Sequence, residues 1–122
     1  MLSEKDVKLY RSGKGSPYLS ASEVMDLLPW LNQNGLFIQS MEAVQIVERG
    51  KDEPRRLEFA ILGLDGGDDW ENHYDIERIN SLARQKLQGA IEEGGEFEFQ
   101  IWIDYGSEYD EERAERLGRA SS

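Results

Sequence analysis

The sequence contains no cysteine and only one histidine, His73. Disulfide bridges, thiolate metal sites and thiol nucleophiles are therefore excluded, and a single imidazole cannot build a histidine-rich metal site. No Gly-x-Ser-x-Gly motif offers this histidine an activated serine partner. We interpret His73 as a loop residue, and we predict no catalytic residue, no bound metal and no other cofactor.

Long apolar runs are also missing from the chain. No stretch approaches the roughly 18–20 consecutive apolar residues that cross a bilayer. The segment Met1 to Asp6 shows neither the basic nor the apolar region of a secretory signal. Because the lack of cysteine also suits a reducing compartment, we expect a cytoplasmic protein that does not bind membranes.

Positive charge is scarce, above all in the second half of the chain. Residues 1–64 carry 8 Lys and Arg against 9 Asp and Glu, a net charge of −1, whereas residues 65–122 carry 6 against 16, a net charge of −10. A field of this sign repels nucleic acid and attracts basic surfaces at long range. We therefore expect a basic protein as the partner and no nucleic acid. Mutual repulsion between copies favours a monomer or a weak dimer.

The first half of the chain has patterns for one helix and several strands. Ser20 to Glu23 has the sequence of a capping box, and an apolar stripe at helical spacing follows it. Pro29 predicts a kink or an early stop in this helix, and Asn34-Gly35 predicts its left-handed cap. We expect a short edge strand at Val7 to Tyr10 and a long or bulged strand from Leu36 to Arg49.

The alternating side chains Leu57, Phe59 and Ile61 predict a strand that forms a hairpin with the strand before it. A second apolar stripe predicts a helix from Ile76 to Ile91, with Asp75 as its cap. Clean alternation between Glu96 and Asp104 predicts a strand with one buried and one solvated face.

These elements give the order β-α-β-β-α-β. We predict an α+β domain over residues 1–106, with an antiparallel sheet, helices on one face and a ferredoxin-like topology. Residues 107–122 are predicted to be a polar C-terminal helix or tail.

An acidic loop interrupted by aromatic residues precedes the second helix. We predict that it contacts the partner through Asp65, Asp68, Asp69, Trp70, Glu71, Tyr74 and Asp75. The alternative interpretation is a solvated loop that keeps the protein soluble. A calcium loop that begins at Asp65 is excluded, because its sixth position would be Trp70 rather than glycine. A magnesium ion bridged by carboxylates is not selected by any spacing.

The solvated face of the last predicted strand adds four candidate partner-binding residues, Glu96, Glu98, Trp102 and Asp104. Taken singly, each fits an ordinary polar face with one exposed tryptophan. Together with the acidic loop they would form one anionic surface with two indoles, which resembles an interface hot spot. The segment Gly13 to Ser16 lacks the spacing of a phosphate-binding loop.

Three short segments resemble small bacterial immunity proteins, which neutralise nuclease toxins such as colicins. These segments are Asn34 to Ile38, Leu62 to Gly67, and Ile91 to Gly95 running into Phe97 to Phe99. The resemblance implies an acidic protein that blocks a basic toxin site, with Asp65, Asp68, Asp69, Glu96 and Glu98 as contact residues.

The functional prediction is a non-enzymatic acidic protein that docks on a basic protein surface, most concretely an immunity or inhibitor protein. Two other classes remain open at this point. One is a small carboxylate-dependent hydrolase, with or without magnesium, and the other is a structural or adaptor subunit.

Overall fold

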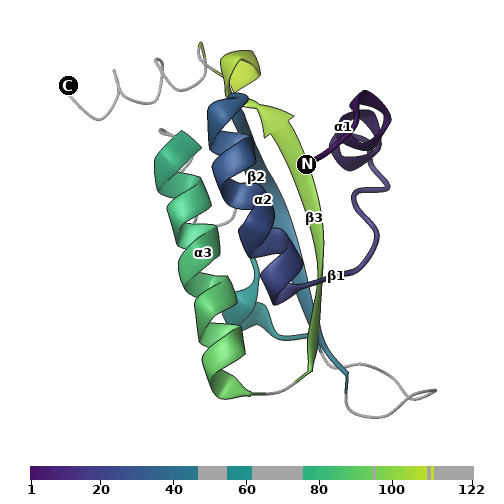
Figure 1. Cartoon of the computed structure of the whole chain (residues 1–122). Coiled ribbons are helices and arrows are strands. Elements are labelled where there is room, and N and C mark those ends of the chain that lie inside the picture. The colour runs from purple at the N-terminus through teal and green to yellow at the C-terminus, as the bar shows by residue number, and fades with distance from the viewer. Residues whose placement is uncertain (47–54, 62–75, 95, 110, 112–122) are drawn as a thin grey trace.

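A computed structural model describes residues 1–46, 55–61, 76–94, 96–109 and 111. Its elements, in chain order, are α1 (Glu4–Arg11), β1 (Leu19–Ser20), α2 (Ala21–Gln33), β2 (Leu36–Gln45), the 3-10 turn η1 (Leu57–Phe59), α3 (Ile76–Glu93), β3 (Phe97–Tyr105) and the 3-10 turn η3 (Gly106–Tyr109). The described residues therefore form an α+β fold (Figure 1).

The sheet has three antiparallel strands in the order β1-β3-β2, so β3 is the central strand. β1 pairs only Leu19 with Phe99 and Ser20 with Glu98. β2 pairs with β3 over its full length, with one register shift between Ile38 and Ser40. This irregularity confirms the bulged strand predicted at this place.

The helices lie on both sides of β3. α2 and α3 run side by side on one side, whereas α1 lies beyond β3 on the other (Figure 1). The expected placement of the helices on one face therefore holds for α2 and α3, and α1 is an addition that the sequence patterns did not predict.

Alternation along β3 determines where the core lies. The side chains that face α2 and α3 are all buried, and those between them are only half-buried. The buried set is Phe97, Phe99, Ile101 and Ile103. This confirms the predicted strand and its two-sided character.

The strand predicted at Val7 to Tyr10 is wrong, because these residues belong to α1. The Ser3 hydroxyl accepts a hydrogen bond from the Asp6 amide at 3.1 Å, and the Asp6 carboxylate accepts one from the Ser3 amide at 3.2 Å. This capping box starts a helix whose buried residue is Tyr10, while Leu9 is exposed. Burial raises the pKa of the Tyr10 phenol.

The capping box predicted at Ser20 and Glu23 is confirmed, and α2 begins directly after it. The helix continues past Pro29 to Gln33, so an early stop at the proline is wrong. Gly35 follows the helix with φ +68°, which confirms the predicted left-handed cap.

The strand predicted through Leu57, Phe59 and Ile61 is also wrong. Leu57 and Phe59 belong to η1, and the backbone of the segment forms only two isolated bridges with β2, from Arg55 to Val44 and from Ile61 to Met41, rather than a ladder. The loop predicted between this segment and β2 lies outside the described residues. The four-stranded ferredoxin-like topology is therefore not shown.

The second predicted helix is confirmed as α3, which buries Ile79, Ala83, Leu87 and Ala90. Ile91, which was predicted on the same apolar stripe, is 44% exposed. The predicted cap Asp75 lies outside the described residues. So does most of the predicted C-terminal helix, of which the structure describes only η3 and residue 111.

One buried polar side chain joins three elements of the core. Asn80 of α3 is 1% exposed and accepts a hydrogen bond from the Ile38 amide at 3.0 Å. It donates to the Leu36 carbonyl at 3.0 Å and to the Asn32 side chain of α2 at 2.7 Å. It thereby satisfies two buried backbone groups of β2 beside the bulge.

Replacement of Asn80 by alanine is expected to lower the free energy of unfolding by about 3 kcal/mol, because two buried backbone groups lose their partner. The matched control is Asn32→Ala, which removes one exposed partner and is expected to cost less than about 1 kcal/mol. Urea denaturation measures both values. Equal losses in the two variants would show that Asn80 has no special role.

Candidate functional site

The predicted binding residues fall into two groups. Those of the acidic loop, Asp65, Asp68, Asp69, Trp70, Glu71, Tyr74 and Asp75, lie outside the described residues, as does His73. The other four, Glu96, Glu98, Trp102 and Asp104, lie in β3 or directly before it. The structure therefore tests the geometry of the second group, and it separates this group into two places.

Trp102 does not stand free on an open face. Its indole N–H donates to the Gly13 carbonyl at 3.2 Å, and its ring lies against Gly15. The neighbouring Gln100 donates to the carbonyls of Lys14 and Ser16 at 2.8 and 2.9 Å. The loop that follows α1 thus covers this part of the outer face of the sheet.

Asp104 is likewise engaged within the chain. Its carboxylate accepts a hydrogen bond from the Arg11 Nε at 2.9 Å, and Glu108 accepts another from the same guanidinium. The hydrogen bond to Asp104 is the main cause that raises the pKa of Arg11. The ion pair with Arg11 neutralises the charge of Asp104. Asp104 therefore does not contribute a free carboxylate to the predicted anionic surface.

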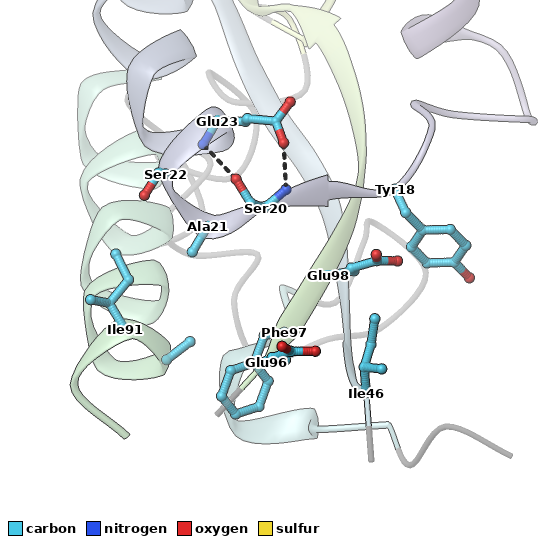
Figure 2. Close-up of a pocket in the computed structure, with 11 residues that line it drawn as sticks. Tyr18, Ser20, Ala21, Ser22, Glu23, Ile46, Ile91, Glu96, Phe97 and Glu98 are labelled. Carbon is cyan, nitrogen blue, oxygen red and sulfur yellow. Dashed lines mark hydrogen bonds between the residues drawn. The ribbon is translucent and has the colours of Figure 1, made fainter. Parts of the chain in front are cut away.

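Glu96 and Glu98 line a surface hollow of about 390 Å³ at the other end of β3. The hollow lies between the start of α2, the last turns of α3 and the edge of the sheet (Figure 2). It is lined by Tyr18, Ser20, Ala21, Ser22, Glu23, Ile46, Ala90, Ile91, Glu96, Phe97 and Glu98. A volume of this size falls within the range of ligand-binding clefts.

The capping box shapes one wall of the hollow. The Ser20 hydroxyl accepts a hydrogen bond from the Glu23 amide at 3.2 Å, and the Glu23 carboxylate accepts one from the Ser20 amide at 3.1 Å (Figure 2). These bonds hold the turn from β1 into α2, and so they hold the chain beside Glu98. A local signal in the sequence thus determines the position of one side of the site.

The hollow combines an acidic rim with an apolar lining. Its charged residues are Glu23, Glu96 and Glu98, and no lysine or arginine of the described residues lines it. Tyr18 is 52% exposed and Ile91 is 44% exposed, so apolar surface remains accessible beside the carboxylates.

Five described carboxylates are paired with arginine, and Glu96 and Glu98 are not among them. Glu42 lies 3.1 Å from Arg55, and Glu93 lies 2.6 Å from Arg56. Within the described part of the chain, neither Glu96 nor Glu98 has an ion-pair partner. Two neighbouring carboxylates that lack a counter-charge are suited to receive a cation from outside.

The sequence patterns did not predict Tyr18 and Ile91 as site residues. Tyr18 was missed because the edge strand was expected at Val7 to Tyr10, whereas the strand that borders the hollow is β1. Ile91 was assigned to the core stripe of its helix. Its position as the last apolar residue before the helix ends could have signalled that it lies at the rim.

Metal and membrane sites can be assessed only for the part of the chain that is described. There, no group of three or more His, Asp or Glu side chains is placed to hold a metal ion. None of the helices described has the length and apolar character needed to cross a membrane. The acidic loop, for which a magnesium site was considered, lies outside these residues.

No protein-family model matches the chain, and no curated protein matches it at a significant level. The resemblance to immunity proteins of nuclease toxins therefore stays a prediction from short sequence segments.

The contact between Trp102 and the N-terminal loop can be tested with two glycines. Gly15 has φ +70°, and a Cβ there would lie 2.6 Å from the Trp102 ring, whereas Gly35 has φ +68° and open space around it. We expect Gly35→Ala to cost about 1 kcal/mol of unfolding free energy from backbone strain alone. Gly15→Ala should cost about 2–4 kcal/mol, because overpacking adds to the same strain.

Thermal denaturation followed by circular dichroism measures the two losses side by side. An equal loss in both variants would contradict the tight packing of Trp102 on this loop.

Proposed function

We propose that this chain is a non-enzymatic binding protein that docks on a basic surface of another protein through the hollow at the end of β3. The observation that carries the proposal is that Glu96 and Glu98, which have no ion-pair partner among the described residues, lie on the rim of an accessible apolar hollow. The carboxylates favour a partner with a positively charged surface, and the apolar lining provides contact area once the two surfaces meet.

The net charge of the whole chain also favours a basic protein as the partner. Its net charge is −11, of which −10 belongs to residues 65–122, the half that contains Glu96 and Glu98. A field of this strength accelerates the approach of a basic protein and slows that of nucleic acid or an anionic membrane. It also disfavours close association between copies, so we propose a monomer or a weak dimer.

The most concrete form of the proposal is an immunity or inhibitor protein that neutralises a basic toxin, such as a nuclease, in the cytoplasm. The acidic charge and the resemblance of three sequence segments to immunity proteins support this form. In such a protein, Glu96 and Glu98 would contact the toxin directly. Asp68 and Trp70 of the acidic loop, which lie outside the described residues, are proposed as further contact residues.

A titration with a cationic peptide tests the proposed surface. We expect acetyl-Leu-Lys-Leu-Lys-Leu-amide to shift the backbone amide resonances of Ser22, Ile91, Glu96 and Glu98 in ¹⁵N spectra of the intact chain. The double variant Glu96→Gln/Glu98→Gln should weaken binding about fivefold, because each surface ion pair contributes up to about 1 kcal/mol.

The matched control is Glu4→Gln/Glu111→Gln, which removes the same charge at positions outside the hollow. It should leave the peptide affinity within about twofold of the wild-type value. Shifts that spread evenly over the surface, or equal weakening in both double variants, would contradict a binding site at the hollow.

A further inference from the structure

Two arginines of the chain are held in the same way, by an aromatic ring together with carboxylates. The Arg11 guanidinium lies over the Tyr105 ring, 4.7 Å from its centroid, and pairs with Asp104 and Glu108. A planar guanidinium can stack on a ring and donate to carboxylates at its edge at the same time.

Arg56 repeats this arrangement with a different set of residues. It lies over the rings of Phe59 and Phe97, 5.2 and 5.4 Å from their centroids, and it pairs with Glu58 and Glu93. The hydrogen bond to Glu93, followed by that to Glu58, raises the pKa of Arg56. The hydrogen bond from Arg56 in turn lowers the pKa of Glu58.

The hollow presents the same kind of surroundings without an arginine. Tyr18, which precedes β1, and Glu98 of β3 line the hollow on the same side, and Glu96, directly before β3, lies two positions from Glu98 (Figure 2). Side chains two positions apart on a strand start about 7 Å from each other, so a guanidinium between them can donate to both carboxylates. Within the described residues, no arginine or lysine occupies this place.

We infer that the hollow receives an arginine side chain of the partner, with an apolar neighbour of that arginine seated on the Ile91 side. The inference rests on the proposed function and specifies its ligand. Arginine fits better than lysine, because the guanidinium is more weakly hydrated, stacks on Tyr18 and donates in a fork. A lysine ammonium would gain the charge interaction alone.

Three peptides that differ in one residue test this inference on the intact chain. They are acetyl-Leu-Xaa-Leu-amide with arginine, lysine or citrulline at the centre, and ¹⁵N chemical-shift titration gives their dissociation constants. We expect the arginine peptide to bind roughly two- to fivefold more tightly than the lysine peptide, as one exposed cation–π contact allows. Citrulline has the planar shape of arginine without its charge. The citrulline peptide should therefore bind too weakly for the chemical shifts to reach saturation.

Two variants of the exposed tyrosine identify the source of the preference. Tyr18→Leu should remove the difference between arginine and lysine while both still bind, and Tyr18→Phe should keep the difference. Because Tyr18 is 52% exposed, both variants are expected to fold.

Each outcome separates the inference from the function on which it rests. Equal affinity of arginine and lysine for the wild-type hollow would overturn the arginine inference and leave a cation-binding hollow in place. Binding of citrulline as tight as that of arginine would overturn both, because charge would then not be recognised. Failure of both cationic peptides to shift the hollow residues would overturn the proposed function.

Discussion

The positions of Glu96, Glu98, Trp102 and Asp104 depend on the pairing of β3 on both of its edges. β2 pairs with it along one edge, and β1 together with Ser16 pairs along the other, where the Ser16 amide donates to the Ile101 carbonyl at 2.9 Å. A strand fixed on two sides cannot slip by one residue without moving its apolar side chains into water. This constraint keeps Phe99 and Ile101 in the core, and it keeps Glu98 directed away from the core.

Two of the described arginines, Arg11 and Arg56, form ion pairs that connect neighbouring elements of the fold. Arg11 ties the N-terminal helix to the end of β3, and Arg56 ties η1 to α3 and β2, where it also donates to Gln45 at 2.7 Å. These arginines neutralise the carboxylates around them. The negative charge that stays open in the described residues therefore includes the rim of the hollow, where Glu96 and Glu98 lie beside accessible apolar surface.

Local signals in the sequence predicted much of the fold, whereas contacts between distant segments could not be predicted. The capping box at Ser20 and the alternation along β3 each depend on residues a few positions apart, and both are confirmed. Residues Val7 to Tyr10 were misassigned, because a weak alternation over four residues cannot be told from one helical turn. The hydrogen bond from Trp102 to Gly13 joins residues 89 positions apart, and no local sequence pattern specifies such a contact. For the same reason, Glu98 was predicted as a site residue but Tyr18 beside it was not.

The central claim is that Glu96 and Glu98 of the hollow recognise a basic partner. Its most direct test is the association rate with a basic protein that binds the chain, measured by stopped flow at increasing ionic strength. The account predicts a steep fall of the rate with salt in the wild-type chain, since screening shortens the field to about 8 Å at physiological ionic strength. It also predicts a slower and less salt-sensitive rate when Glu96 and Glu98 are both replaced by glutamine. A rate that is indifferent to salt and to these two replacements would contradict the account.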